Sequence, residues 1–217
     1  MRFPFTIEQF MQVFSDYNLG VWPIQIYLVM IASVLIVLIL KNMPGIGKLV
    51  LAILGFFWLW MGVAYHLMYF TEINAAAYGF GAAAVLQSIV FFFLAFKKSP
   101  VFSSDFSTRS MAGIVLIVYS ILIYPLIAHF QGHIFPVSPT FGLPCPTTIF
   151  TFGILLFLQQ RIPFFIVFIP LLWTIIGTSA AMMLGMVEDY GLIISGVIYI
   201  VMRNFHLPEN EPLQLKD

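Results

Sequence analysis

The fold is decided by residues 49–69, which read LVLAILGFFWLWMGVAYHLMY and contain no Asp, Glu, Lys or Arg. A helix of about 20 apolar residues is long enough to cross the roughly 30 Å hydrocarbon core of a bilayer. The stretch is also too continuously apolar for a barrel strand, whose two faces alternate between lipid and lumen. It therefore predicts a transmembrane α-helix.

Six further stretches have the same character, and none of them contains an acidic or basic residue. They are Trp22–Leu40, Ala76–Phe96, Met111–Ala128, Pro146–Gln159, Pro163–Met183 and Tyr190–Met202. Together the stretches predict an all-α, polytopic transmembrane helical bundle with about seven spans. Residues 146–159 are few for a span, so either the bilayer thins there or residues 135–143 dip inward as a re-entrant turn. The last stretch is also short.

The composition agrees with a membrane environment. Hydrophobic types make up 61% of the 217 residues and charged types only 8%, whereas about a quarter of an average soluble domain is charged. A soluble fold could not cover its surface with so few charges, but a lipid-facing surface needs none. The formal net charge is zero, so nothing favours a nucleic-acid partner. The single cysteine, Cys145, excludes an intrachain disulfide.

The charges of the connections predict the orientation. With seven spans, every basic residue except Arg2 falls on one side of the membrane. These residues are Lys41, Lys48, Lys97, Lys98, Arg109, Arg161, Arg203 and Lys216. The positive-inside rule makes that side cytoplasmic, so the N-terminus is outside and the C-terminus is cytoplasmic. Five acids share the outer side, namely Glu8, Asp16, Glu72, Glu188 and Asp189.

The chain divides into three regions. Residues 1–20 predict a short amphipathic helix that lies in the membrane interface, because apolar and polar positions are interspersed along it. Thr6 and Gln9 have the spacing of a capping box, and Phe5 and Phe10 could form a hydrophobic staple. Residues 21–203 form the seven-span domain, and residues 204–217 form a polar cytoplasmic tail.

The outer side also collects the histidines that could ligate a metal ion. His129 and His133 are four residues apart, so on a helix they share one face and could hold one ion. The alternative is two interfacial histidines that bond to backbone or lipid headgroups. His66 could complete a three-histidine set or join Glu72, and its alternative is a histidine that bonds across the bundle.

Cys145 lies between Pro144 and Pro146, a pattern that suits the first turn of a helix. Exposed N–H groups at a helix start favour a thiolate, which binds soft ions such as Cu(I). One thiolate alone is a poor site, and the alternative is a small buried thiol. The candidate metal ligands, for a divalent or soft ion, are His129, His133, His66, Cys145 and Glu72. Glu188 and Asp189 are interpreted as solvated loop acids, or as acid–base partners of the histidines.

Three stretches carry a resemblance to a known family. They are Pro4–Phe10 (PFTIEQF), Trp58–His66 (WLWMGVAYH) and Ser138–Thr148 (SPTFGLPCPTT). Over nearly its whole length the chain resembles an uncharacterised family of bacterial multi-pass membrane proteins, a domain of unknown function. The resemblance implies a bacterial inner-membrane location and brings no activity or site residue. A looser likeness to ceramidase-type membrane hydrolases covers the number of spans and a histidine-based zinc site, but the order of motifs differs.

Three functions are compatible with these patterns. The first is binding or transport of a metal ion or small polar solute at an outward-facing site. The second is a structural or accessory role, in which small residues such as those at 79–84 contact a partner or another copy of the chain. The third is a membrane-embedded, metal-dependent hydrolase with Glu72 or Glu188 as the base. Sequence motifs for nucleotide loops, serine triads and zinc proteases are absent.

Overall fold

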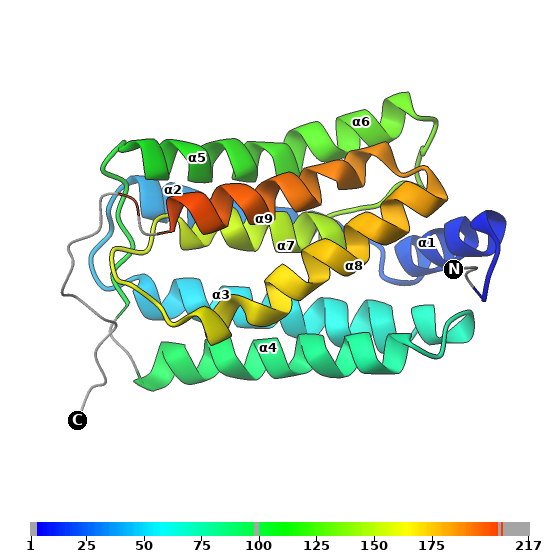
Figure 1. Cartoon of the computed structure of the whole chain (residues 1–217), viewed down its shortest axis with the longest axis horizontal. Helices are drawn as coiled ribbons and strands as arrows, with labels where there is room; N and C mark the ends of the chain where they lie inside the picture. The colour runs from blue at the N-terminus through cyan, green and yellow to red at the C-terminus, as the bar shows by residue number, and fades with distance from the viewer. Residues whose placement is uncertain (1–3, 98–99, 204, 206–217) are drawn as a thin grey trace.

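A computed structural model describes residues 4–97, 100–203 and 205, and every regular element in this part of the chain is helical. The longer helices run side by side and form a bundle (Figure 1). The elements are α1 (Ile7–Gly20), α2 (Ile24–Leu40), α3 (Gly47–Trp60), η1 (Met61–Leu67), η2 (Phe70–Glu72), α4 (Ala77–Lys97), α5 (Thr108–Val118), η3 (Tyr119–Ile123), α6 (Tyr124–Phe130), α7 (Pro144–Leu155), η4 (Phe164–Val167), α8 (Phe168–Leu184), η5 (Val187–Asp189) and α9 (Tyr190–Met202). The segments η1 and η3 are π-helical, and the other short elements are 3-10 turns.

Four helical segments of the described chain are long and apolar enough to cross a membrane. They are Gly47–Glu72, Ala77–Lys97, Thr108–Phe130 and Phe164–Leu184, and they coincide with the second, third, fourth and sixth predicted spans. A fifth is added if α1 and α2, which meet at 80°, count as one bent span. The remaining two stretches form α7, with 12 residues, and α9, with 13. The predicted all-helical fold class is confirmed. That the chain crosses the membrane seven times stays a prediction.

The N-terminal helix begins as its sequence predicts. The Thr6 hydroxyl accepts a hydrogen bond from the Gln9 backbone N–H, and Gln9 Oε1 accepts one from the Thr6 backbone N–H. This reciprocal pair confirms the capping box. The rings of Phe5 and Phe10 stack with their centroids 5.8 Å apart, as the predicted staple requires. The position of α1 in a membrane interface stays a prediction.

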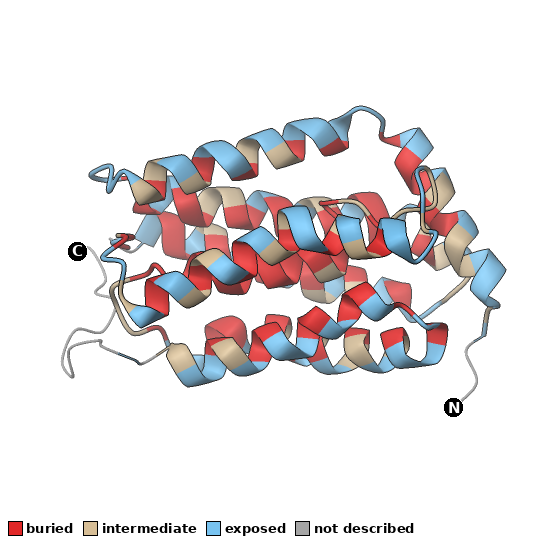
Figure 2. Ribbon diagram, turned by 90° about the horizontal axis from the view of Figure 1, so that it is seen from above, coloured by how far each residue is buried: buried red, intermediate tan, exposed pale blue. Residues whose placement is uncertain are grey.

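The short helix α7 forms the centre of the bundle. All of its residues except Cys145 are buried, and the buried positions of the other long helices face inward (Figure 2). A helix that is apolar on every side packs inside protein. The helix α7 is therefore surrounded by its neighbours. It packs closely against α5, where a Cβ atom on Gly113 would lie 2.8 Å from the Gly153 carbonyl oxygen.

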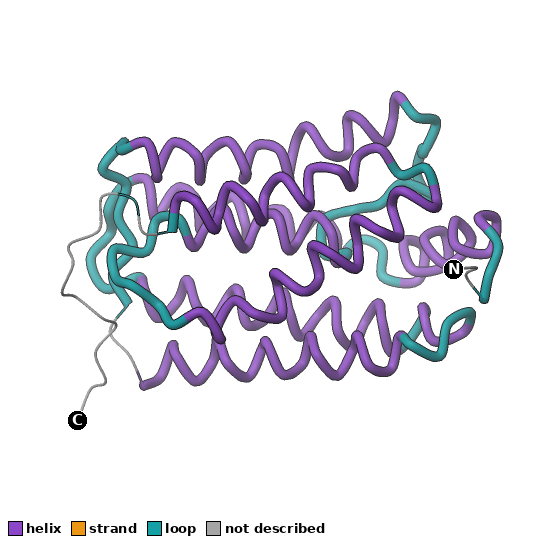
Figure 3. Tube along the Cα trace, viewed as in Figure 1, coloured by secondary structure: helices purple, strands orange, loops and turns teal. Residues whose placement is uncertain are grey.

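The loop between α6 and α7 runs back toward the centre of the bundle (Figure 3). Phe141, Gly142 and Leu143, at the end of this loop, are buried. Gly142 has φ +102°, a conformation that glycine adopts without steric cost, and a Cβ atom there would lie 2.6 Å from Leu28 Cδ1. This path agrees with the predicted inward dip of residues 135–143 and starts α7 well inside the bundle.

The charges of the described residues gather at opposite ends of the bundle. Lys41, Lys48, Lys97, Arg109, Arg161 and Arg203 belong to the end where α2, α4, α7 and α9 finish. Glu8, Asp16, Glu72, Glu188 and Asp189 belong to the opposite end, called here the acidic end, which contains α1, η2, η5 and the start of the α6–α7 loop. Asp105 is the acid of the basic end. The described residues do not include Arg2, Lys98 or Lys216. Of the predicted tail they include only Phe205.

Candidate functional site

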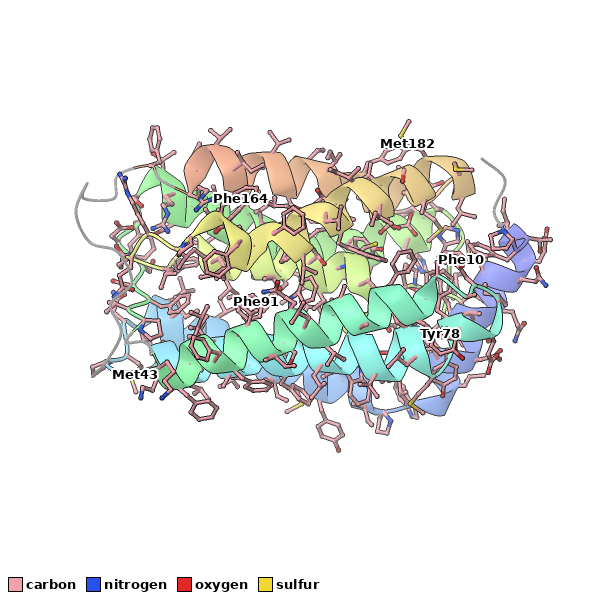
Figure 4. The ribbon with its side chains drawn as sticks, turned by 60° about the horizontal axis from the view of Figure 1, so that its bottom comes forward. Phe10, Met43, Tyr78, Phe91, Phe164 and Met182 are labelled. Carbon is pink, nitrogen blue, oxygen red and sulfur yellow. The ribbon has the colours of Figure 1, made fainter. Side chains whose placement is uncertain are left out.

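A partly open cavity of about 340 Å³ lies at the acidic end among α1, η1, α4, α7 and α8, and is called here the acidic-end cavity. Most of its wall consists of aromatic rings. These rings belong to Phe5, Phe10, Phe14, Tyr65, His66, Phe70, Phe80, Tyr124 and Trp173. Figure 4 shows Phe10 at this end of the bundle. Polar lining comes from Asn74, Cys145, Ser179 and Asp189, together with the polar atoms of those rings.

Two π-helical segments position aromatic residues of the cavity. The segment η1 extends α3 and contains Tyr65 and His66. The segment η3 extends α5 and ends immediately before Tyr124. A π-turn contains one residue more than an α-turn, so it changes which side chains face the interior, and such turns occur frequently at functional sites.

The turn between α8 and α9 brings two acids into the interior. Helix α8 ends at Gly185, whose φ of +74° is the left-handed conformation typical of a helix C-terminus. The 3-10 turn η5 follows, and it leaves Glu188 0% and Asp189 6% exposed. The interpretation of these residues as solvated loop acids is therefore wrong. The sequence could not show that the turn is tight enough to fold both carboxyl groups under the neighbouring helices.

Glu188 links this turn to the α6–α7 loop. His133 Nδ1 lies 2.8 Å from Glu188 Oε1, so the two side chains form an ion pair when the imidazole is protonated. The Tyr119 hydroxyl donates a hydrogen bond of 2.7 Å to the Glu188 backbone carbonyl. Glu188 does not line the cavity. Its role is to hold η5 against the loop that precedes α7.

Asp189 is the one acidic side chain that the described residues contribute to the cavity wall. Its carboxylate accepts a hydrogen bond from the Tyr124 hydroxyl, and the Cys145 thiol also bonds to it. Burial raises the pKa of Asp189 from 3.8 to about 7, because the charged form loses its hydration. The two hydrogen bonds act in the opposite direction, Glu188 raises the pKa further, and His133 lowers it. Near neutral pH, Asp189 thus exists in both charge states.

One other polar atom of the cavity wall lacks a partner. His66 Nδ1 is buried and makes no hydrogen bond within the described structure, whereas the Trp173 side chain interacts with the Cys145 thiol. The rings of His66 and Trp173 meet edge to face with centroids 5.2 Å apart. A buried polar atom without a partner costs free energy, so a ligand group that bonds to His66 Nδ1 would recover it. Both residues line the acidic-end cavity.

The five candidate metal ligands do not come together as one cluster. His66 and Cys145 line the cavity, His133 pairs with Glu188, and His129 and Glu72 are exposed. Helix α6 ends at Phe130, so His129 and His133 do not share a helix face as the spacing suggested. In the part of the chain that the structure describes, no three His, Cys, Asp or Glu side chains are grouped so that they could hold a metal ion. Metal binding by a smaller subset stays a prediction.

Sequence reasoning missed Trp173, Tyr124 and the role of Asp189 in the cavity wall. Trp173 and Tyr124 lie inside apolar stretches, where an aromatic residue is ordinarily a packing residue. Asp189 lies in the connection between two apolar stretches, where an acid is ordinarily solvated, so no local signal marked it as a buried residue.

Comparison with known proteins identifies a family whose function is unknown. The family described as "Family of unknown function (DUF6064)" matches residues 7–209 of the chain. No curated protein and no solved structure matches it. The match agrees with the resemblance to a domain of unknown function, and it transfers no ligand or catalytic residue to the site.

Proposed function

We propose that this chain, which belongs to the DUF6064 family of unknown function, binds a small organic cation in the acidic-end cavity. The observation that carries this proposal is Asp189, a buried carboxyl group in a wall of aromatic rings. An organic cation is one kind of the small polar solute expected from the sequence. The charge distribution of the connections supports an outward-facing site.

Aromatic rings suit a cation with apolar substituents. The face of an aromatic ring carries partial negative charge and attracts a cation within about 6 Å of its centroid. Around His66, the rings of Phe80, Trp173 and Tyr65 have centroids 5.8, 5.2 and 5.2 Å from the imidazole centroid, so they form one continuous aromatic surface. Such a surface contacts alkyl or benzyl groups and stabilises an ammonium charge at the same time.

The charges of the wall favour a cation over an anion. Within the described residues, the cavity lining includes Asp189 and no Lys or Arg. An anion would meet a carboxyl group without a compensating cation, whereas an ammonium group would stabilise the ionised carboxylate and lower its pKa. The groups that face Asp189 are Tyr124, Cys145, Glu188 and His133. Because His133 pairs with Glu188, a bound cation would be the natural counter-ion of Asp189.

The volume of the cavity limits the size of the ligand. Small-molecule sites have volumes of about 300–1,000 Å³, and the acidic-end cavity lies at the lower limit of this range. It therefore suits a ligand of one ring or a short branched chain. A hydrolase would need an activated water as well, and the described His, Cys, Asp and Glu residues supply no three-ligand metal centre to provide one.

The proposal is tested by a pair of probes that differ in charge and share a shape. Benzyltrimethylammonium is a permanent cation, and neopentylbenzene replaces its nitrogen by carbon. Calorimetry on the purified protein should show saturable binding of the cation and at least about tenfold weaker binding of the hydrocarbon. At 100 times its dissociation constant, the cation should stabilise the protein by about 2.7 kcal/mol.

A variant with a blocked cavity provides the control. Ala180, on α8, lines the cavity, so Ala180→Trp should abolish binding of the cation. Ala82 is exposed on α4 and lines none of the hollows described here, so Ala82→Trp should bind normally. Equal binding of the two probes, or normal binding by Ala180→Trp, would contradict the proposal.

A further inference from the structure

A second hollow lies on the side of the bundle between α2, the η3–α6 segment and the loop before α7. This hollow, called here the lateral groove, has a volume of about 370 Å³. Its lining includes Gln25, Ile26 and Met30 of α2, together with Ser120, Tyr124 and Thr140. It is separate from the acidic-end cavity, although Tyr124 and Pro139 line both.

Gln25 is a polar residue of the groove whose side-chain oxygen accepts no hydrogen bond. Its side chain is only 5% exposed, and Nε2 donates a hydrogen bond of 2.9 Å to the Asn18 carbonyl. That bond fixes the orientation of the amide, and Oε1 is left buried without a partner. A buried acceptor of this kind costs about 1–3 kcal/mol until a donor reaches it. The missing partner is therefore a hydrogen-bond donor.

Three hydroxyl groups of the lining already donate to other acceptors. Ser120 donates to the Ile117 carbonyl at 2.9 Å, and Thr140 donates to Asn18 Oδ1 at 2.7 Å. The Tyr124 hydroxyl donates to Asp189, on the far side of the wall. None of these groups is bonded to Gln25 Oε1. A bound molecule with a hydroxyl group could therefore supply the donor.

The lining also defines the charge of that molecule. As far as the chain is described, it contains no Asp, Glu, His, Lys or Arg. A phosphate or an ammonium group in the groove would be desolvated without an opposite charge, which is strongly unfavourable. An uncharged hydroxyl group has no such cost. The occupant that fits is apolar, uncharged and carries a hydroxyl donor at one end.

The surroundings of the groove indicate where the occupant comes from. Trp22, just before α2, and Ile26 and Met30, on α2, line the groove and are 57%, 47% and 56% exposed. Met30 lies five residues after Gln25, and at 1.5 Å per residue this is about 7.5 Å further along the helix. A molecule bonded to Gln25 could therefore extend its apolar part along α2, on a surface suited to lipid.

We propose that the lateral groove binds an uncharged bilayer lipid with a free hydroxyl group, of the diacylglycerol class, whose hydroxyl donates to Gln25 Oε1 and whose chain lies along α2. This site does not depend on the cation site, because Asp189 is not part of its lining. The lipid supplies the donor that the described protein groups do not.

The test uses the full chain in phosphatidylcholine nanodiscs that contain diacylglycerol with a photoactivatable diazirine in its acyl chain. Mass spectrometry of the irradiated protein should locate the label on α2 and on residues 119–141. The O-methyl ether of the same lipid, which lacks the donor, should label this region about tenfold less, as expected for the loss of one buried hydrogen bond. Gln25→Leu should lower labelling by the alcohol to the level of the ether.

Gln87→Leu is the matched control. Gln87 is 1% exposed and likewise donates from Nε2 to a backbone carbonyl, that of Ile166, at 3.0 Å. It lies outside the groove, so labelling should be unchanged. Ala180→Trp should also leave labelling unchanged, which separates this site from the cation site. If Gln25→Leu does not fold, the comparison of alcohol and ether on the native chain decides. Equal labelling by alcohol and ether, or no label in the groove, overturns the proposal.

Discussion

Asp189→Asn is expected to lower the affinity of the protein for benzyltrimethylammonium about 100-fold. The amide has nearly the shape of the carboxylate and its oxygen can still accept from Tyr124, so the cavity should keep its form. The negative charge is lost, however. Removing one partner of a buried charge pair typically costs about 2–5 kcal/mol of binding free energy. Calorimetry on the purified variant measures the change.

Glu72→Gln is the matched control for this substitution. It removes one carboxylate from the same end of the bundle, but Glu72 is exposed and does not line the cavity. Water and salt screen exposed charges, so affinity should change less than about twofold. If the two variants lost affinity to the same extent, a general attraction of cations to the acidic end would explain the binding, and the specific role of Asp189 would be wrong.

Gly153→Ala is expected to lower the stability of the protein substantially. A Cβ atom at this position would lie 2.7 Å from Ile117 Cγ1 and 3.0 Å from the Gly113 carbonyl oxygen. One neighbour is backbone, so α5 and α7 would have to move apart. Overpacking of this kind costs about 1–3 kcal/mol, and α7 lies at the centre of the bundle. Thermal unfolding in detergent should show a clearly lower midpoint.

Gly79→Ala should not lower the midpoint of thermal unfolding. Gly79 lies on α4, and a Cβ atom there would meet nothing within 4 Å. Alanine favours the helix over glycine by about 1 kcal/mol, so the midpoint should stay unchanged or rise. A Gly153→Ala protein as stable as the native chain would mean that α5 and α7 do not approach each other as described.

Much of the fold follows from the sequence because apolar length and helix capping are local signals. Residues 49–69 predicted a long helix, and the segment Gly47–Glu72 confirms it. The capping box at Thr6 depends on two residues three positions apart, and it is present. The expectation of seven spans relied on apolar length alone. Apolar length does not distinguish a helix that faces lipid from one that is buried, and α7 is buried among its neighbours.

The candidate site was less predictable because it depends on contacts between distant residues. The sequence drew attention to His66 and Cys145, and both line the acidic-end cavity. It also favoured His129, but the helix that should have aligned this residue with His133 ends at Phe130. Asp189 becomes significant only when η5 packs beneath Tyr124 and Cys145, which lie 65 and 44 positions away in the sequence. No local pattern encodes that arrangement.

The most direct test of the cation site is the pH dependence of benzyltrimethylammonium affinity in the native protein. The probe does not titrate, so the profile reports on the protein alone. Since the pKa of the free Asp189 carboxyl is raised to about 7, protonation competes with the cation as the pH falls. The dissociation constant should rise about tenfold from pH 8 to pH 6, and the Asp189→Asn profile should be flat. A flat profile in the native protein, or tighter binding at pH 6, would contradict a cation site built on Asp189.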